Sequence, residues 1–257
     1  MATPLDEIEF LARSEYRGVV LEALVEEPLT RGELREATDA SQPTLGRVLD
    51  ELETRHWIDR DDRRYEIMPA GRIVSKAFTA LYETLATEGK FREITPLLPL
   101  EVMDFPFTCL ADATVITPTR ADPSAPINRN LDLLTQATRV RSLSHSFVDQ
   151  ALRVIIERTV EETQTFEGVT TQHAIDGLAS ADVRAVLTAE NGQLYVHREI
   201  PPSVGMAIID RSVTFLVRDE QAVLRALIVT DDETVRTWAE ETFERHKHEA
   251  EPADQVG

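Results

Sequence analysis

The chain has 257 residues, of which 42% are hydrophobic, enough apolar material for two domains with real cores, which argues against a disordered acidic chain. Its 46 Asp and Glu outnumber 27 Lys and Arg, and this net charge of −19, with Lys nearly absent, is typical of proteins from salt-accumulating halophiles. The single cysteine, Cys109, excludes an intramolecular disulfide, and without a long apolar run or a leader pattern we expect no membrane partner and a cytoplasmic location.

The chain opens with helical patterns. Residues 8–25 place apolar side chains at helical spacing, with Ser14 as the cap of the main first helix. Thr30 and Glu33 form the sequence signature of a capping box, which predicts the start of a second helix. The side chains expected to face inward from that helix are Leu34 and Ala37.

A further helix is predicted after a tight turn. Ser41 is its cap, and Pro43 falls at an early position, where the missing N–H would be unpaired anyway. Its apolar stripe recurs at positions 3, 4 and 7 and consists of Leu45, Val48, Leu49 and Leu52. Polar residues off this stripe would reach base edges if the pair is a helix-turn-helix, and our candidates are Gln42, Thr44 and Arg47.

Residues 57–67 predict a short hairpin with a charged tip, placed where a winged helix carries its wing. Capped helix pairs also occur in all-α bundles, so the hairpin makes the winged helix-turn-helix the better interpretation. Residues 1–90 carry 12 basic and 19 acidic side chains, net −7, so no basic domain announces DNA binding. Candidate DNA-binding residues nevertheless cluster around the predicted reading surface: Arg31, Ser41, Gln42, Thr44, Arg47, Arg60, Arg63 and Arg64.

A long helix should follow Pro69, and its apolar stripe must be buried on its own domain or on a second copy of the chain. We favour the homodimer. The segment 87–90 reads as a break and 95–100 as a proline-punctuated connector, with the domain boundary between 88 and 98. The expected division is a winged helix-turn-helix, a connector and dimerisation helix, an α/β ligand-sensing domain and a solvated tail, at residues 1–70, 71–98, 99–248 and 249–257.

Strands and helices alternate beyond the connector, which predicts a largely parallel sheet with helical crossovers. The expected strands there are 113–118, 140–144 and 169–174, separated by helices over 126–137 and 147–163 and followed by one near 176–189. Four close strands follow as a meander, and a terminal helix packs back onto the sheet. The expected elements of this last part are 193–198, 204–210, 213–218, 224–229 and 232–247. The fold class is therefore α+β, with a mixed sheet.

A ligand site is expected where the first two of these strands end, because open sheets bind ligands at the carboxyl ends of their strands. Hydroxyls, an imidazole, arginines and helix N–H groups there would suit an anion such as a phosphate. The alternative is that the serines only cap a helix, the histidine lies on the surface and the arginines pair with acids. Our candidates are Thr119, Arg120, Arg129, Arg141, Ser142, Ser144, His145 and Ser146.

The residues Val115–Thr119, Asp122–Pro126 and Leu131–Leu134 resemble the middle domain of archaeal methanogenesis-regulator-type proteins. The whole plan is similar to TrmB-type regulators of sugar metabolism, whose sensor domain resembles a phospholipase-D-like fold. This resemblance implies an archaeal transcription regulator with a sugar-related effector, such as a phosphorylated sugar or triose. The resemblance also suggests enzyme activity as an alternative, but phospholipase-D catalysis needs a His-x-Lys triplet, which does not occur here.

The sequence therefore predicts a regulator that binds double-stranded promoter DNA under the control of a small metabolite. The alternative is a winged-helix module for protein–protein assembly without DNA, which would expose aromatic and aliphatic side chains on the second helix instead of hydrogen-bonding groups. We expect no enzyme activity and no cofactor, because nucleotide-binding, hydrolase and metalloprotease motifs are absent. The histidines are scattered without ligand spacing, so no metal site is expected either.

Overall fold

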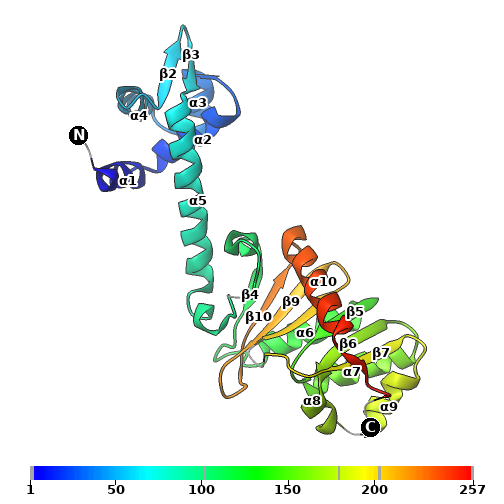
Figure 1. Ribbon diagram of the computed structural model, residues 1–257. Coiled ribbons are helices and arrows are strands. Elements are labelled where there is room, and N and C mark those ends of the chain that lie inside the picture. The colour runs from blue at the N-terminus through cyan, green and yellow to red at the C-terminus, as the bar shows by residue number, and fades with distance from the viewer. Residues whose placement is uncertain (1–2, 101, 179, 202–203, 256–257) are drawn as a thin grey trace. The chain divides into compact units, whose positions relative to one another are not determined.

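The computed structural model describes residues 3–100, 102–178, 180–201 and 204–255 (Figure 1). Contacts between residues divide the chain into two compact units, Met1–Ala86 and Thr87–Gly257. The division lies within the segment 71–98 that the sequence assigns to a connector, just before the range 88–98 predicted for the boundary. Within the described ranges, none of the helices combines the length and the apolar character that crossing a membrane requires.

The N-terminal unit is a winged helix, as the sequence predicts. Its strands form an antiparallel sheet in the order β1-β3-β2, in which β2 and β3 are the hairpin. The helices are α1 (Pro4–Ala12), α2 (Glu15–Glu26), α3 (Arg31–Thr38), α4 (Gln42–Thr54) and α5 (Pro69–Phe91). The strands are β1 (Leu29–Thr30), β2 (Ile58–Asp61) and β3 (Arg64–Ile67).

Local hydrogen bonds set where α3 and α4 begin. The Glu33 N–H donates to the Thr30 hydroxyl at 3.3 Å and the Thr30 N–H donates to the Glu33 carboxylate at 2.7 Å, which confirms the capping box. The Ser41 hydroxyl accepts from the Thr44 N–H at 3.4 Å and caps α4. Leu34 is buried as predicted, but Ala37 is exposed and Ala40 is buried instead. The reason is that the chain leaves the helix at Asp39, which has the left-handed backbone angle φ of 53°.

The predicted stripe of α4 faces the core of this unit, where it packs with α2. Its members are Leu45, Val48, Leu49 and Leu52. Full burial of a side chain of this size contributes about 1.5–3 kcal/mol, so this stripe fixes which face of α4 remains outside. The buried Arg17 of α2 adds an ion pair of 2.6 Å to Glu51 of α4, which ties the two helices together.

Helix α5 is longer than the sequence predicts. The segment 87–90 was expected to break the helix, but α5 continues through it to Phe91. Gly71 lets the start of this helix approach the chain closely, because a Cβ there would lie 2.0 Å from the Trp57 carbonyl oxygen. At the other end, Phe91 and Ile94 are buried in the core of the C-terminal unit, so packing offsets the low helix propensity of Gly89.

The C-terminal unit is built on one mixed sheet of strand order β11-β7-β6-β5-β8-β9-β10-β4. Strands β5, β6 and β7 are parallel, whereas the pairs from β5 to β8 and onward to β4 are antiparallel. The strands are β4 (Thr114–Ile116), β5 (Arg139–Leu143), β6 (Thr165–Thr171), β7 (Gly192–His197), β8 (Val204–Ile209), β9 (Ser212–Arg218), β10 (Leu224–Thr230) and β11 (Glu251–Pro252).

Two predictions about this sheet are wrong. The expected four-strand meander has only three members, since β7 pairs with β6 in parallel and is separated from β8 by β6 and β5. The expected solvated tail after residue 248 contributes β11, which pairs antiparallel with β7 at the sheet edge. Turn residues predicted the meander, and they do not specify which strand a segment pairs with.

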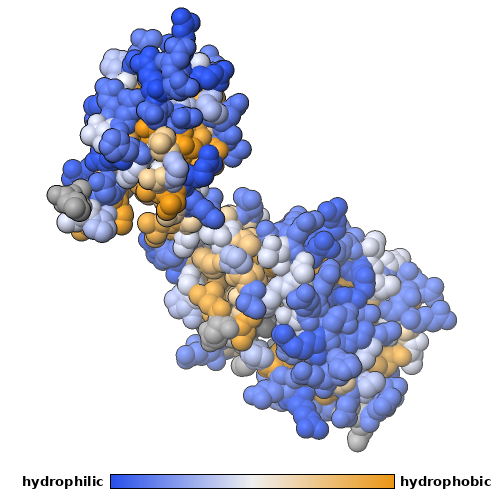
Figure 2. All heavy atoms as spheres, turned by 45° about the horizontal axis from the view of Figure 1, so that its top comes forward, coloured by the Kyte–Doolittle hydropathy of each residue, from blue (hydrophilic) through white to orange (hydrophobic). Residues whose placement is uncertain are grey.

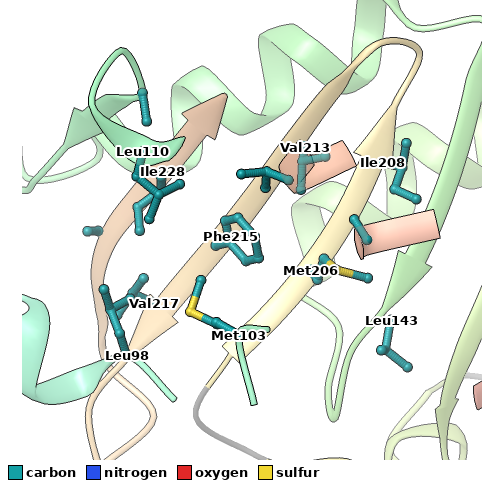
Figure 3. Close-up of a cluster of buried hydrophobic side chains, with 14 of the residues drawn as sticks. Leu98, Met103, Leu110, Leu143, Met206, Ile208, Val213, Phe215, Val217 and Ile228 are labelled. Atoms are coloured by element: carbon teal, nitrogen blue, oxygen red, sulfur yellow. The ribbon is translucent and has the colours of Figure 1, made fainter. Parts of the chain in front are cut away.

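Helices cover both faces of the sheet. The terminal helix α10 packs on one face over the core that Figure 3 shows, where Phe215 lies among Met103, Met206 and Val213. Side chains from α6, α7 and α9 form a second core on the opposite face. The helices of this unit are α6 (Ala125–Gln136), α7 (Asp149–Val160), α8 (Gln172–Asp176), α9 (Ser180–Thr188) and α10 (Glu233–His248), with 3₁₀ turns at Thr95–Leu97 and Phe107–Leu110.

Candidate nucleic-acid interface and sensor cavity

The outer face of α4 presents hydrogen-bonding side chains to solvent. Gln42 in its first turn is exposed, and its side chain makes no hydrogen bond to the described residues. Arg47, one turn further on, has 63% of its side chain exposed and only a loose ion pair of 3.7 Å to Glu51. Thr44 is half-buried, and its hydroxyl lies 2.8 Å from the Ser41 hydroxyl, so both belong mainly to the cap. Of the three predicted base-edge candidates, Gln42 and Arg47 are therefore the two whose side chains are exposed and not held by the cap.

Arg31 extends the same surface from the start of α3. Its guanidinium donates to the Gln42 carbonyl oxygen at 3.1 Å and lies over Gly46 of α4. A Cβ at Gly46 would lie 2.5 Å from Nη2 of Arg31, so glycine leaves the room that this arginine occupies. The positive charge of Arg31 thus sits directly on the outer face of α4.

The three arginines of the wing lie in different environments. The Arg60 side chain donates to the Asp62 carbonyl oxygen at 3.0 Å, within the hairpin turn. The Arg64 side chain donates to the Pro28 carbonyl oxygen at 2.7 Å and lies 3.9 Å from the Glu33 carboxylate. Arg63, at the tip, is exposed and makes no bond to any described residue. Arg63 is therefore the wing arginine most available to a phosphate.

The predicted ligand residues are not brought together as a group. Strand β4 lies at the edge of the sheet beside β10, so three strands separate its end from the end of β5. Thr119 is exposed and accepts a hydrogen bond from the Asp122 N–H, and Arg120 is exposed nearby. Arg129 lines a different cleft, with Asp231 and Asp232. The prediction that the first two strands end at one pocket is wrong, because strands adjacent in sequence are not adjacent in this sheet.

Arg141 points away from the serines that follow it. Its guanidinium lies on the α10 face, 3.2 Å from Glu167 and 3.2 Å from Glu244. Neighbouring strand residues face opposite sides of a sheet, so Ser142 lies on the face that α6 and α7 cover. The ion-pair interpretation therefore holds for Arg141.

The three serines do line one cavity of about 40 Å³, together with residues of α6, α7, β8 and β9. Helix α7 begins at Asp149 with Val148 at its N-cap, so Ser144 and Ser146 do not cap it. The Ser144 hydroxyl instead donates to the Ser146 carbonyl oxygen at 2.6 Å. His145 is turned elsewhere, its Nδ1 lying 3.2 Å from the Ile200 carbonyl oxygen. Of the predicted set, Ser142, Ser144 and Ser146 share a site.

Sequence reasoning missed Arg218, the last residue of β9. Strands β5 and β9 are parallel to each other because both pair antiparallel with β8, so their carboxyl ends meet at one edge. Arg218 lines the cavity and is only 7% exposed. Burial lowers the pKa of its guanidinium from the ordinary value. The signal in the sequence that could have revealed it is an arginine at the end of a mostly apolar strand, VTFLVR.

A larger and mainly apolar cleft of about 260 Å³ lies on the α10 face. Its polar side chains are already engaged, since His246 Nδ1 contacts the Thr242 carbonyl oxygen at 2.7 Å and Arg245 reaches the Thr242 hydroxyl at 3.5 Å. Across the described ranges, His, Cys, Asp and Glu form no group that could hold a metal ion.

Family models match two separate parts of the chain. Residues 5–90 match the family described as HVO_A0261 N-terminal domain, and residues 123–249 match the middle domain of the methanogenesis regulatory protein FilR1. A search of the curated proteins found no match.

Among solved structures, TrmBL2, described as an archaeal chromatin protein with a novel mode of DNA binding, aligns over 95% of this chain and 98% of its own, with 17% identity and a TM-score of 0.44. The phospholipase D family member Nuc from Salmonella typhimurium aligns over 55% of this chain and 98% of its own, with 12% identity and a TM-score of 0.42. NucT from Helicobacter pylori aligns over the same shares of the two chains, with 13% identity and a TM-score of 0.45.

Proposed function

We propose that this chain, which combines an HVO_A0261-type N-terminal domain with a FilR1-type middle domain, is a sequence-specific transcription regulator controlled by a small metabolite. The observation that carries the proposal is the division of α4 into two faces. Its apolar stripe is fully used in the core, while Gln42 and Arg47 remain exposed beside the wing. Hydrogen-bonding groups at this position of a winged helix suit base edges in the major groove.

The acidity of the N-terminal unit shapes how this binding must work. With 12 basic against 19 acidic side chains in residues 1–90, a general attraction to phosphate is weak, and individual arginines have to supply it. Arg31, on the outer face of α4, and Arg63, at the tip of the wing, are both exposed. Binding should therefore depend on direct base contacts more than on net charge.

We propose further that the regulator is a homodimer formed through α5. Figure 2 shows hydrophobic side chains gathered at the surface of the N-terminal unit. They border a groove of about 500 Å³ whose lining includes Ile8, Val19, Leu81, Tyr82 and Leu85. Leu81, Tyr82 and Leu85 are exposed in the single chain, at 43%, 68% and 57%. The same face of a second copy would cover them, since a two-fold interface places a patch against itself.

Genome-wide occupancy of the tagged protein tests the proposal. The wild type should occupy discrete promoter sites, and Arg47→Ala should lose them. Arg13→Ala is the matched control, because Arg13, the C-cap residue of α1, has 74% of its side chain exposed in the same unit and is not among the residues proposed to contact DNA. Occupancy unaffected by Arg47→Ala, or no sites at all, would favour the alternative of a protein–protein assembly module. The phosphorylated-sugar effector stays a prediction.

A further inference from the structure

Arg218 carries a buried positive charge for which the described residues supply no partner. It makes no ion pair and no hydrogen bond to the residues that the structure describes, although the chain holds 46 carboxylates. The described residues that line its cavity include no Asp or Glu. Buried charges are ordinarily paired, because taking a lone charge out of water costs far more than a surface position does. An anion from outside the chain is the missing partner that this arrangement indicates.

Other hydrogen-bonding groups converge on the same cavity. Asn130 of α6 is 3% exposed, and its amide makes no hydrogen bond within the described part of the chain. The hydroxyls of Ser142 and Ser146 likewise have no described partner. Each of these groups can donate to an oxyanion, so the cavity offers hydroxyl and amide donors beside one guanidinium.

Gly205 keeps the guanidinium and a serine close to each other. A Cβ at this position of β8 would lie 3.0 Å from the Ser144 hydroxyl oxygen and 3.5 Å from Arg218 Nη1. The two groups therefore flank the same point of the backbone, where the start of β8 lies between the ends of β5 and β9. A methyl group there would crowd the Ser144 hydroxyl and come into van der Waals contact with the guanidinium, without changing any charge.

The size of the cavity limits what it can hold. A cavity needs a volume of roughly 10–15 Å³ to hold one water molecule, so a cavity of about 40 Å³ holds about three water-sized groups. This suits the carboxylate or phosphate of a small metabolite and is too small for a whole sugar. We propose that Arg218, with Ser142, Ser146 and Asn130, binds the oxyanion of a small anionic effector. The inference rests on the proposed metabolite-sensing role and assigns its site and ligand chemistry.

The experiment is isothermal titration calorimetry of the full chain without DNA, in KCl at fixed ionic strength, with inorganic phosphate in one arm and acetate in the other. The geometry predicts binding in at least one arm, and the arm that binds separates the two sources of oxyanion. Arg218→Gln should weaken that binding about 30-fold or more, as truncating one member of a buried charged pair does. Arg211→Gln is the matched control, an exposed arginine of the same unit with the same change in charge, and should bind within about twofold of the wild type.

Two further measurements distinguish an anion-binding role of Arg218 from a role in folding alone. Gly205→Ala should weaken anion binding although it leaves every charge in place. Arg218→Gln should also melt at a temperature equal to or above that of the wild type in the same KCl buffer without phosphate or acetate, because it removes a buried charge that has no partner among the described residues. No binding of either anion, or equal binding by wild type and Arg218→Gln, would overturn the inference. Since DNA is absent, neither result depends on whether the chain binds an operator.

Discussion

The proposed dimer interface is most directly perturbed by Leu81→Asp with Leu85→Asp on α5. Phe78 is left unchanged because its ring packs against Gly18 in the core of the same unit, where a substitution would affect folding. The exposed fractions of the two leucines, 43% and 57%, together amount to about one whole leucine per copy. Burying one such side chain contributes about 1.5–3 kcal/mol, so a dimer loses about 3–6 kcal/mol, and its dissociation constant rises roughly 10²- to 10⁴-fold.

Light scattering coupled to size exclusion, at high KCl, measures the outcome. The wild type should run as a dimer and the double variant as a monomer of 28.9 kDa with the same far-UV circular dichroism. Ala80→Asp with Thr84→Asp is the control, because it adds the same charge to another exposed face of the same helix. A double variant that remains dimeric would refute the α5 interface, and a dimer lost equally in the control would show that charge on α5, not the apolar stripe, is responsible.

Three other predictions concern the N-terminal unit and the charge. Arg63→Ala should weaken binding to all DNA sequences and reduce the slope of log affinity against log salt by about 0.9, and a changed base preference at constant slope would contradict the phosphate role. The Thr30 N–H holds the pKa of Glu33 below its ordinary value, so this cap contributes stability above the unfolded-state pKa and loses it as pH falls through the lower folded-state pKa. Glu33→Gln keeps an acceptor for the hydrogen bond but does not titrate, so the stability of this variant should fall less steeply as the pH is lowered. The urea midpoint of unfolding, measured against pH, tests this, and the same pH dependence in wild type and variant would disprove it. Lowering KCl from about 1 M to 0.1 M lengthens the Debye length from about 3 to 10 Å. Because repulsion within this chain of net charge −19 is then screened less, its melting temperature should fall. A constant melting temperature would contradict the interpretation that the acidity is an adaptation to high salt.

The parts of the fold that the sequence could predict are those that local rules specify. Capping residues and a stripe at helical spacing determine α3 and α4 within a few residues, so the position of Arg47 outside the core was predictable from its neighbours. The order of the strands in the sheet could not be predicted, because strand pairing depends on contacts between segments that are distant in the sequence. That is why Thr119 was grouped with Ser144, although three strands lie between their strands, and why Arg218 was missed. The face of Arg141 did follow from strand alternation, which the grouping by sequence proximity overlooked.

The central claim, sequence-specific DNA binding through α4, is tested most directly by the ratio of two affinities of the full chain at one salt concentration. One duplex carries the operator recovered from occupancy mapping and the other the same bases in shuffled order. We expect the wild type to prefer the operator by at least about 10³-fold. Arg47→Ala should reduce this ratio roughly 5- to 150-fold, the equivalent of about 1–3 kcal/mol from one bidentate contact. A wild-type ratio near one, or a ratio untouched by Arg47→Ala, would contradict the claim.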